Sequence, residues 1–202
     1  EPDEARDIAT AAMANWDQDG FQLQHRHELL AHAEIDLYLG RGGDAYRRFE
    51  RSWSALKRSL LLKAQQQRLE LFDARARAAI AMASESGVDA AAMLAVAERH
   101  AGWIERARMP WADALAKLLR AGIAERTGKP EQAVALLRAA SDGFVASGLA
   151  LHTAIARRIL GHKLGGDEGR ELVAAADTWL VAARVKDAAK VTAALAPGFA
   201  MH

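Results

Sequence analysis

The chain has 202 residues, of which 51% are hydrophobic and 26% are charged, and its formal net charge is +1. This length and apolar content allow one folded domain and exclude global disorder. The near balance of charge gives no reason to expect a nucleic-acid or membrane partner. The absence of cysteine excludes disulfides, thiolate catalysis and cysteine zinc sites, and it is consistent with a cytoplasmic location.

The first residues, Glu1-Pro2-Asp3-Glu4, include neither a Met nor the basic and apolar regions of a signal peptide. No apolar run approaches the ~18 residues of a membrane-spanning helix. We therefore expect a C-terminal fragment of a longer protein, from which an upstream catalytic domain is missing. With no long linker to divide it, the fragment is expected to be a single domain over residues 1–202.

In the first half of the chain, apolar residues recur at the three- and four-residue spacing of a helix face. A break is expected at Gly40-Arg41-Gly42-Gly43-Asp44, and Asp89 is expected to cap a helix. The segment that begins at Leu60-Leu61-Leu62 has apolar positions as far as Met82 and is expected to be one continuous helix that ends near Ser84-Glu85-Ser86-Gly87. The predicted helices of this half cover 3–15, 22–39, 45–58, 60–82 and 89–104.

The clearest helical hairpin is predicted between Trp111 and Ala140. Each of its helices has an apolar stripe, and Thr127-Gly128-Lys129-Pro130 separates them. Three further helices are predicted over 149–164, 168–184 and 187–195. No segment alternates with period two, so no sheet is expected. About ten helices with short connections predict an all-α fold, a right-handed α-solenoid of about five antiparallel hairpins.

The turn of this hairpin carries a family resemblance. Gly128 to Ala133, followed by Leu137 and Ala140, resembles the turn and second helix of a tetratricopeptide repeat. Ala121 and Ala124 stand at the small and aromatic positions of the first helix, and Ala124 departs from the aromatic residue of the repeat. Gly42-Gly43-Asp44 resembles the same turn, although Arg48 stands where the repeat has Ala.

A broader likeness is to the helical-repeat tails of large bacterial signalling proteins, in which the repeats follow a serine/threonine kinase or an ATPase module. The segments that carry it are 59–62, 138–140, 157–161, 165–169 and 195–199. The resemblance implies a non-catalytic interaction or regulatory module without a cofactor. Its partner would be a protein, a peptide or another domain of the same chain, bound on the concave face.

One polar stripe stands out as a candidate binding site. His25, Glu28, His32 and Asp36 fall at positions i, i+3, i+7 and i+11 of one predicted helix, so they share a face. We expect this stripe to line the groove that receives a partner. His27 and His32 are five residues apart, which is one too many for a His-Glu-x-x-His zinc motif.

Other motifs are expected to be structural. Gly128-Lys129 is followed by Pro130 and has no strand before it, so it is a turn and not a phosphate-binding loop. A Gly-x-Ser-x-Gly elbow is absent, and no catalytic residue is predicted. Basic residues are expected to be solvated, and tryptophans to pack between hairpins. These are Arg47, Arg48, Arg51, Lys57, Arg58, Lys63, Arg75 and Arg77, and Trp16, Trp53, Trp103, Trp111 and Trp179.

Two alternative functions stay open from the sequence. The first is a small-molecule-sensing domain of the helical-repeat kind found in some bacterial transcription regulators. The second is a metal-binding helical protein, in which a second helix adds ligands to the polar stripe.

Overall fold

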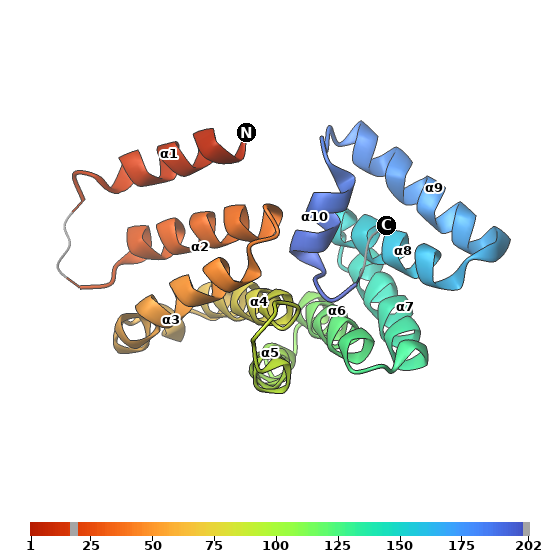
Figure 1. The fold of residues 1–202 in the computed structure, drawn as a ribbon, viewed down its shortest axis with the longest axis horizontal. Helices are drawn as coiled ribbons and strands as arrows, with labels where there is room; N and C mark the ends of the chain where they lie inside the picture. The colour runs from red at the N-terminus through yellow and green to blue at the C-terminus, as the bar shows by residue number, and fades with distance from the viewer. Residues whose placement is uncertain (17–19, 200–202) are drawn as a thin grey trace.

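A computed structural model describes residues 1–16 and 20–199. Within these residues the chain forms ten α-helices and one short 3₁₀ helix, with no strand, which confirms the all-α prediction (Figure 1). No helix of the described part is both long and apolar enough to cross a bilayer. The elements are α1 (Pro2–Met13), α2 (Leu23–Tyr38), α3 (Gly42–Arg58), η1 (Leu61–Lys63), α4 (Gln65–Met82), α5 (Ala90–Glu105), α6 (Pro110–Arg126), α7 (Pro130–Ala146), α8 (Ala150–Leu164), α9 (Gly166–Ala182) and α10 (Ala188–Leu195).

The helices α1 to α9 pack in chain order, each against the next, and together they form an arc (Figure 1). Two further contacts join alternate helices, α2 with α4 and α4 with α6. The even-numbered helices α2, α4, α6 and α8 lie on the inside of the arc, and the face that they form is here called the inner surface. Helix α10 does not extend the array. It turns back into the arc and packs on α2 and α8.

The expected helix over 60–82 is interrupted near its start, so that prediction was wrong in this part. Leu61 to Lys63 form the 3₁₀ helix, Ala64 is extended, and α4 begins at Gln65. Side chains hold the break. The Ser59 hydroxyl accepts from the Leu61 N–H, and the Arg68 Nη1 donates to the Leu62 carbonyl at 2.9 Å. Three consecutive leucines therefore connect two helices here instead of opening one.

Glycines have different roles at the two turns that the sequence singled out. Gly128 has φ +70°, a left-handed conformation that favours glycine, and it ends α6 as predicted. Gly42 and Gly43 lie inside α3, whose start is three residues earlier than expected. A Cβ on Gly42 would collide with Ala81 at the end of α4, and the Gly43 N–H donates to Glu85 Oε1 at 2.6 Å.

Candidate binding surfaces

The inner surface is covered by the C-terminal helix α10 and the residues that follow it. α10 packs on α2 and α8, and it also reaches α4, because the Arg77 Nη1 donates to the Ala194 carbonyl at 3.0 Å. Pro197 and Gly198 approach the backbone of Gly122 in α6. The segment from α10 to Gly198 therefore contacts all four even-numbered helices.

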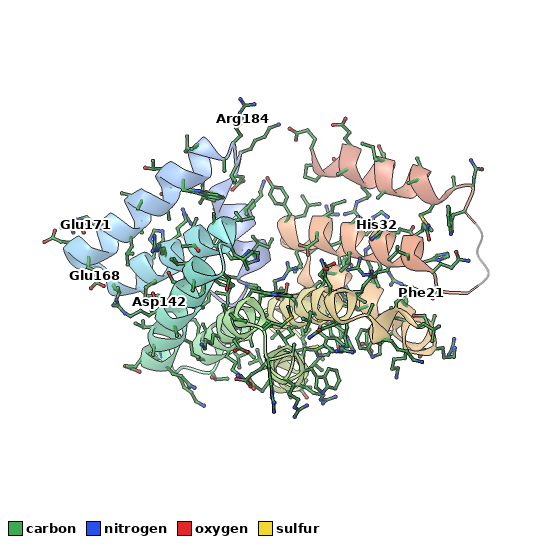
Figure 2. The ribbon with its side chains drawn as sticks, turned by 180° about the vertical axis from the view of Figure 1, so that it is seen from behind. Phe21, His32, Asp142, Glu168, Glu171 and Arg184 are labelled. Atoms are coloured by element: carbon green, nitrogen blue, oxygen red, sulfur yellow. The ribbon has the colours of Figure 1, made fainter. Side chains whose placement is uncertain are left out.

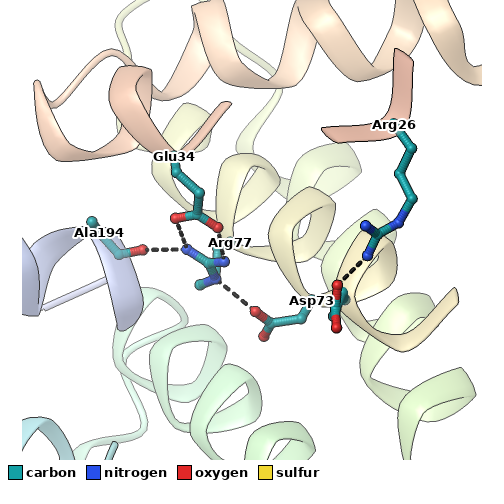
Figure 3. A network of polar contacts seen from close by, with 6 residues as sticks. Arg26, Glu34, Asp73, Arg77 and Ala194 are labelled. Atoms are coloured by element: carbon teal, nitrogen blue, oxygen red, sulfur yellow. Dashed lines mark hydrogen bonds and ion pairs between the residues drawn. The ribbon is translucent and has the colours of Figure 1, made fainter. Parts of the chain in front are cut away.

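Arg77 is the centre of this contact (Figure 3). Its side chain is 5% exposed, and it donates to both carboxylate oxygens of Glu34 in α2 and, through Nε, to Asp73 Oδ2 at 2.8 Å. Burial opposes the charged form, but the two carboxylates outweigh it and raise the pKa of Arg77. Burial alone would raise the pKa of Glu34, and Arg77 instead keeps it below its ordinary value. The guanidinium thus joins α2, α4 and the carboxyl end of α10.

Glycine at position 122 allows the C-terminal segment to lie against α6. A Cβ on Gly122 would collide with the Pro197 carbonyl oxygen, and a Cβ on Gly198 would lie 2.8 Å from the Gly122 carbonyl oxygen. Gly198 itself has φ +108°. Two backbones can approach this closely only where neither residue has a side chain.

A pocket of about 390 Å³ lies beside α10, where α1, α2 and α10 meet. Its walls are mostly apolar and include Ile35, Tyr38 and Leu195. An exposed ion pair between Lys186 Nζ and Glu1 Oε1, 3.0 Å long, stands at its rim. The residues of α2 that face α10 here are thus Ile35 and Tyr38, together with Glu34.

The residues of the predicted polar stripe lie on a different side of α2, facing α3. His25, Glu28 and His32 are brought together in one cavity, while Asp36 is 1% exposed and is not one of the residues that line it. Asp36 Oδ1 accepts from Arg6 of α1 at 2.7 Å, and Asp36 Oδ2 accepts from Arg48 of α3 at 2.5 Å. The Asp36 carboxylate therefore joins three helices. It is not exposed to an incoming partner.

The cavity between α2 and α3, here called the α2–α3 cavity, has a volume of about 340 Å³. α3 contributes Arg48 and Arg51, which the sequence interpretation assigned to a solvated surface, together with Ser52 and Ala55. These four residues are spaced by three and four, so they share one face of α3. That spacing was the available signal, but only the packing of α3 on α2 shows that this face lies opposite the histidines. Phe21 and Leu29 complete the walls, and Figure 2 shows Phe21 near the start of α2 and His32 further along it.

The two histidines of this cavity have different surroundings. His25 Nδ1 accepts from the Gln22 N–H at 3.1 Å at the start of α2, so its Nε2 is the nitrogen that carries a proton. His32 is 7% exposed, and among the described residues no atom pairs with its Nδ1. Burial, and then the charge of Arg48, lower the pKa of His32. His32 Nε2 lies 3.9 Å from Glu28 Oε1, too far for a hydrogen bond.

A metal site on the stripe finds no support in this geometry. In the part of the chain that the structure describes, no three His, Cys, Asp or Glu side chains converge as metal ligands would. The Asp36 carboxylate also forms ion pairs with two guanidinium groups, which would compete with a metal cation for its oxygens.

Arg75 and Arg77 were expected to be solvated, and this expectation was wrong, since both are buried. The Arg75 guanidinium lies 3.9 Å from the centre of the Trp53 ring and forms an ion pair with Glu50. Its Nη1 is 3.5 Å from His100 Nε2. The long aliphatic part of arginine and its planar cation allow it to pack in a core when aromatic rings and carboxylates surround it.

The tryptophans divide into two groups. Trp53 and Trp103 pack with Phe72 and His100 in one aromatic cluster between α3, α4 and α5, as expected of residues between hairpins. Trp111 is half-buried against the core. Trp16 and Trp179 are 38% and 36% exposed, so for these two the packing prediction was wrong.

Comparisons with known protein families, with curated proteins and with solved structures found no match.

Proposed function

We propose that this chain is a non-catalytic protein-interaction module, a right-handed tetratricopeptide-like α-solenoid whose inner surface binds a helical segment of a partner. The observation that supports this proposal is the position of α10, a short helix that lies against α2, α4 and α8, while the residues that follow it contact α6. A surface that accepts a helix from its own chain has the shape and chemistry to accept a similar helix from a partner.

The inner surface favours a particular kind of segment. The buried residues of α10 are Thr192 and Ala194, two small side chains that allow close helix approach, and the larger Val191 and Leu195 are partly buried beside them. Arg77 donates to a carbonyl at the carboxyl end of α10, where helix carbonyls lack intrahelical partners. Because Gly122 has no side chain, the backbone that follows α10 can lie against α6. We propose that the partner offers a short helix with small residues on one face, followed by a sharp turn. The likeness to bacterial signalling tails favours a cytoplasmic partner protein or a neighbouring domain.

The proposal can be tested by releasing α10 from the inner surface. Thr192 is fully buried, and its Oγ1 donates to the Ala188 carbonyl at 2.6 Å. Thr192→Asp buries an unpaired carboxylate in α10 and leaves the inner surface unchanged. A labelled peptide of residues 187–199 is then added, and binding is measured by fluorescence anisotropy. We expect the peptide to bind the variant at least about tenfold more tightly than the unmodified chain, because tethered α10 competes at an effective concentration on the order of millimolar.

Thr178→Asp provides a matched control. Thr178 is exposed on α9, and its Oγ1 makes the same bond to the carbonyl four residues earlier, that of Ala174. This variant should bind the peptide as weakly as the unmodified chain. A Thr192→Asp chain that keeps its helical circular dichroism but does not bind the peptide would contradict the proposal. A peptide that itself carries Asp at position 192 should not bind.

A second candidate function is small-molecule sensing, which the apolar pocket between α1, α2 and α10 favours. Its volume of about 390 Å³ falls in the range of ligand pockets, ~300–1,000 Å³. A thermal-shift screen against metabolites tests it, with Tyr38→Ala as the variant expected to lose any stabilisation. A hit that is unaffected by this change would place the ligand elsewhere.

A further inference from the structure

The α2–α3 cavity contains more free hydrogen-bond donors than acceptors. Arg48 uses Nε for its ion pair with Asp36, and its two Nη nitrogens have no hydrogen-bond partner among the described residues. Arg51 forms neither an ion pair nor a side-chain hydrogen bond with any residue in the described part of the chain. His25 adds the N–H of Nε2, because its Nδ1 is already an acceptor. Glu28 is the carboxylate of the lining. A ligand rich in acceptors would satisfy these donors.

His32 supplies a second, independent indication of a ligand. Its side chain is 9% exposed and lines the cavity, and its Nδ1 has no partner among the described residues. Buried polar atoms without a partner are rare in folded proteins, and a site that binds a polar group is one place where they occur. A ligand in this cavity would come within reach of this imidazole.

The net charge of the side chains in and next to the α2–α3 cavity favours a ligand with a single negative charge. Arg6, Arg48 and Arg51 provide three guanidinium groups, and Glu28 and Asp36 provide two carboxylates, which leaves one positive charge. A monoanion would neutralise it. A dianion would introduce an uncompensated charge close to Glu28, at a cost in binding.

The remaining walls are apolar. Phe21, Leu29 and Ala55 line the cavity, and the Phe21 ring packs near His25 with ring centres 5.7 Å apart. A volume of about 340 Å³ suits a compact molecule. We propose that the α2–α3 cavity binds a small monocarboxylic acid with a compact apolar or aromatic body, its carboxylate held by Arg48, Arg51 and His25.

The proposal is tested by isothermal titration of the full chain with benzoate and with benzamide, its neutral isostere. Benzoate should bind at least about tenfold more tightly than benzamide, because charge-assisted hydrogen bonds to guanidinium groups require the carboxylate. Equal affinity for the two, or no heat from benzoate at millimolar concentration, would overturn the proposal. Phenyl phosphate serves as the dianion, and tighter binding of phenyl phosphate than of benzoate would also overturn it.

Two arginine variants of α3 locate the site. Arg51→Gln removes an exposed guanidinium that has no partner, so the fold should persist, and benzoate affinity should fall at least about tenfold. Arg47→Gln is the matched control, since Arg47 is exposed on the same helix, pairs with Asp44 and does not line the cavity. Equal affinity of the Arg51 variant and the unmodified chain would show that the acid binds elsewhere and would refute the assignment.

The carboxylate could belong to a free small acid or to an acidic side chain of a protein. One further probe distinguishes these two sources. A blocked Ala-Glu-Ala tripeptide presents a carboxylate without an aromatic body. Weaker binding of this peptide than of benzoate supports a free acid, and tighter binding overturns that choice. The α2–α3 cavity and the α10 contact lie on different sides of α2, so the Thr192→Asp change should not alter benzoate affinity.

Discussion

The core from α2 to α5 differs in kind from the core from α6 to α8. In the first region the buried residues include Arg26, His32, Asp36, Arg75, Arg77 and His100. In the second region the described buried residues are Ala, Leu, Ile, Phe and Gly, with Ser141 as the exception. Both regions belong to the same helical array, so the difference does not come from secondary structure.

The charged region joins parts of the chain that are far apart in sequence. Arg77 holds Glu34, 43 residues away, and Ala194, 117 residues away, whereas the α6–α7 hairpin packs neighbouring helices. Apolar packing is tolerant of exact position, but a bidentate ion pair is directional. We infer that the buried charges fix how α2, α4 and α10 meet, and that apolar area stabilises the local hairpins.

The largest expected effect is the difference in the free energy of unfolding between replacing a buried arginine and replacing one at the surface. Arg77→Met leaves Glu34 and Asp73 without their partner and should lower the free energy of unfolding by about 3–5 kcal/mol, as measured by urea denaturation. Arg120→Met is the control. Arg120 also pairs with two carboxylates, Glu98 and Glu105, but at the surface, so its loss should be below about 1 kcal/mol. Equal losses in the two variants would remove the distinction between the regions.

A Leu137→Ala change tests the apolar region. Leu137 is fully buried in α7, and its truncation should lower the free energy of unfolding by about 3 kcal/mol. The adjacent Leu136 is only half-buried, so Leu136→Ala should cost less. Both losses should be the same at pH 5 and pH 8, since no titratable group is removed. A pH-dependent loss would show that the two regions are coupled.

A smaller effect is expected from His100 and depends on pH. Burial, together with Arg75 and Arg99, lowers the pKa of His100 from 6.5 to about 4, although the Val96 carbonyl opposes this. Above pH 6.5 the His100 imidazole is neutral in both the native and the unfolded state, so it does not change the free energy of unfolding with pH. Between pH 6.5 and 4 the unfolded chain binds a proton that the native state does not, so stability falls with falling pH.

The size of this change is measured by comparing the unmodified chain with His100→Gln, which cannot titrate. From pH 7 to pH 4.5 the unmodified chain should lose about 2 kcal/mol more in the free energy of unfolding than the variant does. Parallel pH profiles for the two chains would mean that His100 has the same pKa in the native and unfolded states, which would contradict the prediction.

The helical hairpins and several of their ends could be predicted because their signals are local. Asp89 caps α5 by accepting from the Ala92 N–H at 3.0 Å, and Gly128 ends α6, both as expected. The error at Leu60–Leu62 has a local cause too, since a hydroxyl and an arginine satisfy backbone groups in a way that apolar spacing does not reveal. The burial of Arg75 and Arg77 had no such signal, because their partners come from other helices.

The polar stripe shows what could not be predicted from the sequence, namely the surroundings of each side chain. Helical spacing correctly placed His25, Glu28, His32 and Asp36 along one helix face, but it could not assign them different surroundings. Asp36 is buried because Arg6 and Arg48 reach it from two other helices, and His32 lines a cavity whose opposite wall is α3. Whether the stripe binds a ligand stays a prediction for the benzoate titration.

By itself, the sequence determined the all-α class, the number of helices and the α6–α7 turn, since helix periodicity, caps and turn glycines act over a few residues. Only the tertiary structure decided that α10 folds back over the inner surface, because that contact depends on Arg77, Gly122 and the even-numbered helices meeting at one place. The physical reason is the separation along the sequence over which each interaction acts. Backbone hydrogen bonds in helices are local, whereas ion pairs and close backbone contacts join residues that the chain separates widely.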